Sequence, residues 1–250
     1  MITDPYFYLL AVPGVVLFGI SKGGFGGGLG ILTVPMMALV VPPAQAAAIM
    51  LPILLVMDIG AVWAYRNSWD HKLMKVLLPA GLLGIAIGAL SFRWFSTAGL
   101  KLLLGVIALG FVASRWLRRA GAAPARPSAA KGVFWMTISG VTTFVAHAGG
   151  PPLNVYLLPL RLAPAIYAGT VTILFAVLNY AKVLPYWWLG LFNAEVLATA
   201  AALVPVGLVA VWVGLLLRRR LSETVFYRIV YGLLIVTGTK MLYDGVRGLA

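Results

Sequence analysis

A glycine-rich stretch interrupts the first apolar segment of the chain: residues 19–39 read GISKGGFGGGLGILTVPMMAL. The apolar residues on either side, 6–20 and 29–41, are each too short to cross a hydrocarbon core of about 30 Å, because a helix rises only about 1.5 Å per residue. The two pieces together are too long for a single crossing. We therefore predict a helical hairpin that enters the membrane, breaks at the glycines and returns to the side from which it came.

A second hairpin of the same layout is predicted later in the chain, where apolar segments 132–147 and 151–161 are separated by HAGGPP at 147–152. Six other segments are long enough, or nearly so, to span a membrane as single helices: 44–65, 76–92, 97–117, 164–184, 195–217 and 225–243. Hydrophobic residues make up 62% of the chain and charged residues only 10%, against about 25% charge in soluble domains. The sequence thus predicts an all-α polytopic membrane protein.

The two hairpins belong to a longer internal repeat. Shifts of 121 to 126 residues align like residues in the two halves and preserve the order of the segments. The matched positions are Pro43 with Pro164, Asp58 with Asn179, Gly26-Gly27 with Gly149-Gly150, Gly81 with Gly207, Gly88 with Gly214 and Ser96 with Ser222. Slowly growing offsets are expected of a duplication with small loop insertions, and internal duplication is typical of secondary transporters.

The basic residues predict how the two halves are oriented. Twelve of the nineteen Lys and Arg residues lie in loops 66–75, 115–131 and 218–228, which share one side of the membrane only if both hairpins re-enter. The positive-inside rule favours that arrangement and makes this side cytoplasmic. Each half then consists of a broken, re-entrant hairpin plus three transmembrane helices, an odd number of crossings, so the two repeats are inverted. The predicted units are a first repeat at 1–117, a flexible cytoplasmic linker at 118–131 and a second repeat at 132–250.

Several classes of function have no signal in this sequence. The absence of cysteine excludes disulfides and Cys-ligated metals, and His71 and His147 are too few for a His-rich metal site. No P-loop and no catalytic constellation is present, so we expect neither a cofactor nor an enzyme. The formal net charge of +13 comes from residues that flank apolar segments, which indicates a lipid bilayer as the partner and not a nucleic acid. The sequence leaves a homodimer open.

The first glycine break is the leading candidate for a ligand site. Non-helical backbone is tolerated at membrane depth only where it is buried in protein or lines a wet cavity. Helices that start near Leu29 and Pro151 would point their positive ends at the two breaks, and Lys22 adds a full positive charge, which together predict an anion site. The competing interpretation is that the glycines only permit close helix packing. The candidate substrate-binding residues are Ser21, Lys22, Gly23, Gly24, Gly26, Gly27, His147, Gly149, Gly150 and Asn154.

Other polar residues near the breaks or within apolar segments have two interpretations each. Thr142 and Thr143 could donate hydrogen bonds to an oxyanion or bond their own helix backbone. Asp58 lies well inside 44–65, and an intramembrane carboxylate is a candidate carrier of a coupling proton, the alternative being a structural ion pair with a residue such as Lys22. Lys182 precedes an aromatic PYWW segment, so we expect its side chain to extend toward the membrane surface.

Two stretches carry a family resemblance: the first break with the Pro35 that follows it, and its second copy, GVTTFVAHAGGPPLNVYLLPL at 140–160. With them, the chain resembles the TauE/SafE sulfite exporter family over essentially its whole length. The resemblance implies secondary transport of sulfite, organosulfonates or related small anions across the bacterial inner membrane, most simply by export, with the site between the two hairpin tips. Pro151-Pro152 departs from the pattern of the first break, which leaves open whether both hairpins bind substrate. The alternatives are a passive anion channel and a membrane-embedded enzyme or assembly factor that uses Asp58 and His147.

Overall fold

The computed structural model describes residues 1–24, 30–116, 126–217 and 223–249, and this part of the chain contains helices and turns but no β-strand. Its elements are, in order, α1 (Pro5–Gly24), the 3-10 helix η1 (Gly30–Leu32), α2 (Thr33–Met37), α3 (Pro43–Tyr65), α4 (His71–Phe92), α5 (Thr97–Trp116), α6 (Ala129–Ala146), α7 (Gly150–Leu157), the 3-10 helix η2 (Leu158–Leu160), α8 (Pro164–Trp188), α9 (Ala194–Leu217) and α10 (Glu223–Arg247). Within these residues six helices are long and apolar enough to cross a membrane, namely α1, α3, α4, α8, α9 and α10. The predicted all-α polytopic membrane fold is confirmed.

Local sequence explains where several helices begin. Pro43 and Pro164 are the first residues of α3 and α8, a position where the fixed φ of proline suits a helix and its missing N–H is not needed. Asp70 caps α4 because its side chain accepts hydrogen bonds from two backbone N–H groups of the first turn. Ser128 caps α6 in the same way, so this helix begins at Ala129, inside the predicted linker.

The chain folds back on itself at both predicted breaks. After α1 it returns so that the hydroxyl of Thr33 donates a hydrogen bond to the carbonyl of Gly14 (2.8 Å). After α6 it returns so that the hydroxyl of Ser139 donates to the carbonyl of Gly149 (2.6 Å). These contacts agree with two helical hairpins.

The length of the first hairpin arm differs from the prediction. The helix α1 does not stop at residue 20 but continues through Lys22 to Gly24, and it is long enough to cross a membrane. A glycine inside a helix costs only about 1 kcal/mol relative to alanine. Here the helical course of Gly23 is supported by packing, because a Cβ at this position would lie only 2.2 Å from the carbonyl oxygen of Val211 on α9. Close helix packing, the competing interpretation of the glycines, is what the structure shows for Gly23.

Counterpart glycines in the two halves face counterpart side chains. A Cβ added to Gly81 of α4 would contact Met136 and Leu178. A Cβ added to Gly207 of α9 would contact Met57 and Val15. At a shift of 121 residues, Val15 aligns with Met136 and Met57 aligns with Leu178. Helix α4 therefore packs on α6 and α8 as α9 packs on α1 and α3, which supports the internal repeat.

The counterpart helices α3 and α8 form a central pair in which the two halves contact each other, and they run antiparallel. The carboxylate of Asp58 accepts a hydrogen bond from the amide of Asn179. Further along, the backbone N–H of Asp70, just after α3, donates to the hydroxyl of Thr170 near the start of α8. Residue numbers thus rise along α3 as they fall along α8.

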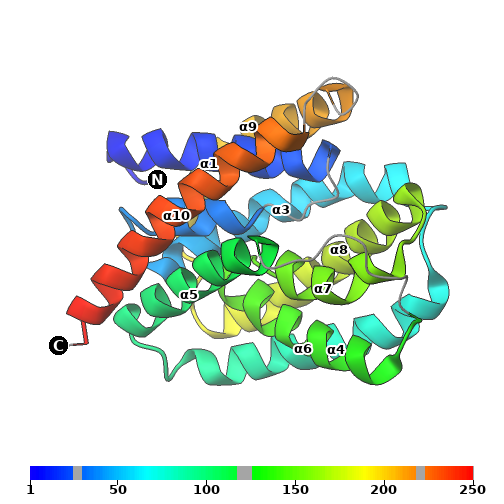
Figure 1. Ribbon diagram of the computed structural model, residues 1–250. Helices are drawn as coiled ribbons and strands as arrows, with labels where there is room; N and C mark the ends of the chain where they lie inside the picture. The colour runs from blue at the N-terminus through cyan, green and yellow to red at the C-terminus, as the bar shows by residue number, and fades with distance from the viewer. Residues whose placement is uncertain (25–29, 117–125, 218–222, 250) are drawn as a thin grey trace.

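Other helices pack against this pair, α9 against α3 and α4 against α8. In the view of Figure 1, α1 and α9 lie along the upper edge and α4 and α6 along the lower edge, with α3 between them. The counterparts α5 and α10 also pair antiparallel, because a Cβ added to Gly105 would contact Leu242 and one added to Gly245 would contact Leu102. Both halves therefore contribute to the interior, where the polar residues gather.

Candidate functional site

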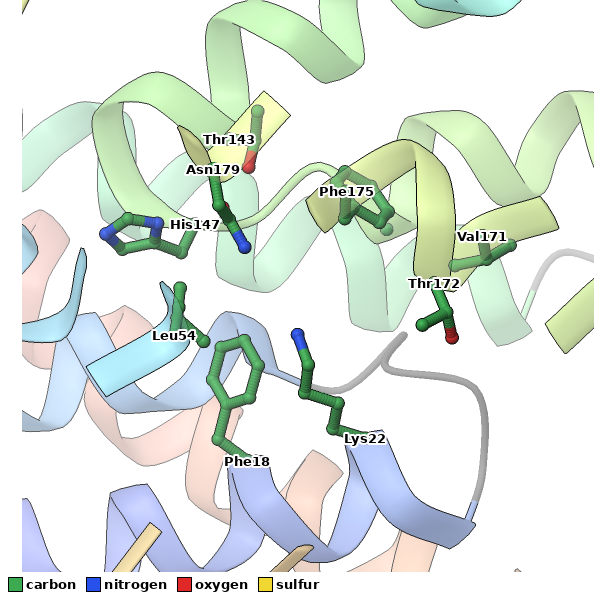
Figure 2. A pocket seen from close by; sticks show the side chains of 10 residues that line it. Phe18, Lys22, Leu54, Thr143, His147, Val171, Thr172, Phe175 and Asn179 are labelled. Atoms are coloured by element: carbon green, nitrogen blue, oxygen red, sulfur yellow. The ribbon is translucent and has the colours of Figure 1, made fainter. Parts of the chain in front are cut away.

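A small cavity lies where elements of both halves meet, at the second chain break (Figure 2). It measures about 30 Å³, so in this conformation it holds water-sized occupants. The polar part of its wall consists of Lys22 from α1, Thr143 and His147 at the end of α6, Gly150 at the start of α7, and Thr172 and Asn179 from α8. The apolar part consists of Phe18, Leu54, Val171 and Phe175.

Lys22 reaches the cavity as one member of a buried chain of charged and polar groups. Its Nζ lies 2.5 Å from Oδ1 of Asp58, and the two side chains are 7% and 0% exposed. The second carboxylate oxygen of Asp58, Oδ2, accepts a hydrogen bond from Nδ2 of Asn179 at 2.7 Å. The ion pair considered for Asp58 is therefore present, and a proton-carrying role for this residue stays a prediction.

His147 ends α6 in the left-handed conformation, with φ of 51°, which is uncommon for a residue other than glycine. Its buried ring has a partner at each nitrogen: Nε2 lies 2.9 Å from the carbonyl oxygen of Ala47 on α3, and Nδ1 lies 2.7 Å from Nζ of Lys182 on α8. A carbonyl oxygen can only accept, so Nε2 must carry a hydrogen. The ring thus joins α6 to both central helices.

Lys182 lies in the interior and does not extend to the membrane surface, so the sequence prediction for this residue is wrong. Its side chain is 0% exposed, and its Nζ is 3.0 Å from the carbonyl oxygen of Thr143, 3.4 Å from the Thr143 hydroxyl and 2.7 Å from Nδ1 of His147. These three acceptors match the three donors of an ammonium group. Helical spacing could have indicated this interior position, since Lys182 is three residues beyond Asn179 and therefore shares its face of α8.

The buried charges of the described residues do not balance. When Lys182 carries a proton, the buried charged side chains are Lys22, Lys182 and Asp58, and His147 is neutral because its Nδ1 accepts a hydrogen bond from the Lys182 ammonium. Two cations then face one carboxylate. An uncompensated charge in a membrane interior is expensive, and it marks a place where an anion would be stabilised.

The structure brings together only part of the predicted substrate-binding set. Lys22, His147 and Gly150 line the cavity, whereas Gly26 and Gly27 lie outside the described residues and Gly24 ends α1. The other predicted residues lie away from the cavity wall: Ser21 and Gly23 in the last turns of α1, Gly149 beside Ser139, and Asn154, whose Oδ1 accepts a hydrogen bond from the hydroxyl of Tyr167.

The second break offers fewer backbone donors than predicted. Helix α7 begins with Gly150, Pro151 and Pro152, and the two prolines have no N–H. The N–H of Leu153 donates to the carbonyl of Gly149 at 3.3 Å. At the first break, the described α2 has only five residues. The positive character of the site therefore comes mainly from lysine side chains and less from helix ends.

Neighbouring polar residues divide between the two interpretations considered for them. The hydroxyl of Thr142 donates to carbonyl oxygens of its own helix, those of Ile138 and Ser139, and so bonds the backbone. Thr143 lines the cavity and holds Lys182. Sequence reasoning missed the lining residues Thr172 and Phe175, although helical spacing was again an available signal, since they lie seven and four residues before Asn179 on the same face of α8.

Comparisons with known proteins match this chain to a family of exporters over most of its length. The family model described as "Sulfite exporter TauE/SafE" matches residues 11–241. A protein of Cupriavidus necator named "Probable sulfite/organosulfonate exporter TauE" is 24% identical over 247 residues, which are 97% of this chain and 95% of the relative. No solved structure matches. The matched region contains both chain breaks and all the buried charged residues of the site.

Proposed function

The chain belongs to the TauE/SafE sulfite exporter family, and from this membership we propose that it exports a small sulfur oxyanion, sulfite or an organosulfonate, across the bacterial inner membrane. The protein is a multi-pass membrane transporter and not an enzyme. We further propose that it works as a secondary transporter by alternating access, with a proton as the coupling ion. The sequence has no P-loop that would let the chain use ATP by itself.

The observation that carries the proposal is the positive excess around the cavity. Lys22 points its amino group into the space below His147 and Asn179 (Figure 2). When Lys182, behind His147, is protonated, two ammonium groups and one carboxylate surround the position. A small oxyanion there would balance the charge and accept hydrogen bonds from Lys22, Asn179 and Thr172. The cavity must widen for such an occupant, as a change between two access states would allow.

Inverted repeats are the proposed basis of alternating access. The support is that the counterpart helices α3 and α8 run antiparallel and that Asp58 and Asn179, which the repeat aligns, touch each other. In transporters built this way the site lies where the two repeats meet, and one repeat moves against the other. The cavity is lined by α1 and α3 from the first half and by α6, α7 and α8 from the second.

The orientation of the repeats predicts a labelling pattern. The loop between α3 and α4 and its counterpart between α8 and α9 should lie on opposite sides of the membrane. The chain has no cysteine, so Asn67→Cys and Ala194→Cys, both at exposed positions, each introduce a single reactive thiol. With an impermeant maleimide in intact cells, we expect Ala194→Cys to react and Asn67→Cys to react only after lysis. Labelling of both from the same side would contradict inverted repeats.

The proposed function is tested by binding and by uphill transport. Purified protein should bind sulfite, thiosulfate, taurine or sulfoacetate in preference to sulfate and to carboxylate analogues such as acetate. In proteoliposomes loaded with the best ligand, labelled ligand should accumulate transiently against its gradient by counterflow. Equilibration without accumulation would indicate a passive channel, and failure of every sulfur oxyanion to bind would refute the proposal.

A further inference from the structure

The hydrogen bond between His147 and Lys182 can exist with or without one proton. The Nδ1 and Nζ atoms lie 2.7 Å apart, so at least one of these nitrogens must present a lone pair. A neutral pair satisfies this condition, and so does a pair with a single positive charge shared between the amine and the imidazole. A second positive charge would place two cations in direct contact. The pair can therefore gain or lose one proton and keep its hydrogen bond.

The charged groups around the pair decide which of its two states is favoured. Lys22 on α1 and Asp58 on α3 are near enough to act on the pair electrostatically, and the ring of Tyr186 on α8 lies beside that of His147. The hydroxyl of Tyr186 donates to the carbonyl of Phe144, and Asp58 is already paired with Lys22. Among the described residues, no carboxylate forms an ion pair with Lys182. A positive charge on the pair is costly while the cavity contains only water, and an anion in the cavity would offset that cost.

The position of the two residues gives the proton a route. His147 lines the cavity, whereas Lys182 lies behind it and is held by the carbonyl and hydroxyl of Thr143. The Nε2 atom already carries the hydrogen that it donates to Ala47, so a proton taken from water in the cavity adds at Nδ1 while the bond from Nδ1 to Nζ is briefly open, and the bond then re-forms around the shared proton. It returns to water by the same ring when the anion leaves.

Asp58 is less suited to carry that proton. One of its oxygens contacts the ammonium group of Lys22, and the other accepts a hydrogen bond from Asn179. Protonation of this carboxyl would break the ion pair and leave Lys22 as an unpaired buried cation.

We propose that His147 and Lys182 form the proton site of the transporter, and that the pair takes up one proton when an oxyanion binds in the adjacent cavity. The inference rests on the proposed function, because it requires an anion at this position. By linkage, the anion raises the affinity of the pair for a proton and the proton raises the affinity of the cavity for the anion. Each anion that crosses the membrane then carries one proton in the same direction, and the empty site returns without either.

The test counts protons by titration calorimetry on the full-length protein, in buffers of different ionisation enthalpy. The probe is methanesulfonate, a monoanion that does not titrate near neutral pH, with sulfite as a second ligand. We expect uptake of about one proton per anion bound by the wild type. We expect this uptake to fall to near zero in Lys182→Met and in Lys182→Gln, the second of which keeps a hydrogen-bond donor toward Thr143 and His147.

Two further variants make the result specific. Asp58→Asn should retain proton uptake if the pair carries the proton, and the exposed control Lys75→Met on α4 should match the wild type. Loss of uptake in Asp58→Asn with retention in the Lys182 variants would overturn the inference, and so would the absence of uptake in the wild type. Absence of binding heat for both ligands would refute the proposed function itself, and the inference with it.

A measurement on the wild type alone keeps the inference testable if the Lys182 variants do not fold. Proton uptake on binding requires the affinity for methanesulfonate to fall as the pH rises, by up to about tenfold per pH unit. An affinity that is constant between pH 5 and 9, or that rises with pH, would contradict the inference.

Discussion

The variant Gly84→Ala is expected to lose much of its folded protein, although it adds a single methyl group. The new Cβ would lie 2.2 Å from the carbonyl oxygen of Thr137 and 2.7 Å from Cα of Gly140. Both are backbone atoms, so no side chain can rotate away, and α4 must separate from α6 along their whole contact. Overpacking in a core usually costs about 1–3 kcal/mol, and we expect this backbone clash to exceed that range.

The matched control is Gly60→Ala on α3, where an added Cβ meets nothing within 4 Å. Alanine favours a helix over glycine by about 1 kcal/mol, so this variant should be as stable as the wild type or slightly more stable. The two are compared by thermal unfolding in detergent, followed by tryptophan fluorescence and by the fraction that elutes as a monodisperse species. Equal unfolding temperatures for Gly84→Ala and Gly60→Ala would contradict the close packing of α4 on α6.

The second large effect is expected at Lys22, where Lys22→Met should weaken anion binding at least tenfold, about 1.4 kcal/mol. The substitution removes the ammonium group that faces the cavity and leaves the carboxylate of Asp58 uncompensated beside the anion. It should also destabilise the fold, because breaking a buried ion pair by removing one partner costs about 3–5 kcal/mol.

The double variant Lys22→Met with Asp58→Asn separates these two effects. It removes both charges, so the unfolding temperature should recover most of the loss seen in Lys22→Met. Calorimetric affinity for sulfite or methanesulfonate should remain at least tenfold below that of the wild type, because the ammonium group is still missing. Wild-type affinity in the folded double variant would show that Lys22 serves only as the partner of Asp58.

The helices could be predicted because they depend on local properties of the chain. Apolar length places a membrane helix, and prolines such as Pro43 and Pro164 mark where α3 and α8 begin. The aligned positions Asp58 and Asn179 touch in the structure, as a central pair of counterparts can. The end of α1 was mispredicted because helical glycine is tolerated where a neighbouring backbone packs against it, and that neighbour, α9, lies far away in the sequence.

The site was only partly predictable. Lys22 and His147 were identified because a charged or titratable residue beside a chain break is unusual in an apolar sequence. Lys182 was misassigned because an aromatic segment nearby is a general signal for the membrane surface, whereas its actual position depends on Thr143 and His147, which belong to another helix.

By itself the sequence determined that this protein is an all-helical membrane protein with two broken segments and a positively charged first break, and it predicted an internal repeat. Hydrophobic length, proline and glycine placement and charge distribution are sufficient for that, since each is a property of a short stretch in contact with lipid or water. The tertiary structure alone decided that Lys22 pairs with Asp58 and that Lys182 binds His147 beside the same cavity. The free energy of a buried charge depends on the partners that other helices bring to it, and those partners are set by packing across the whole fold.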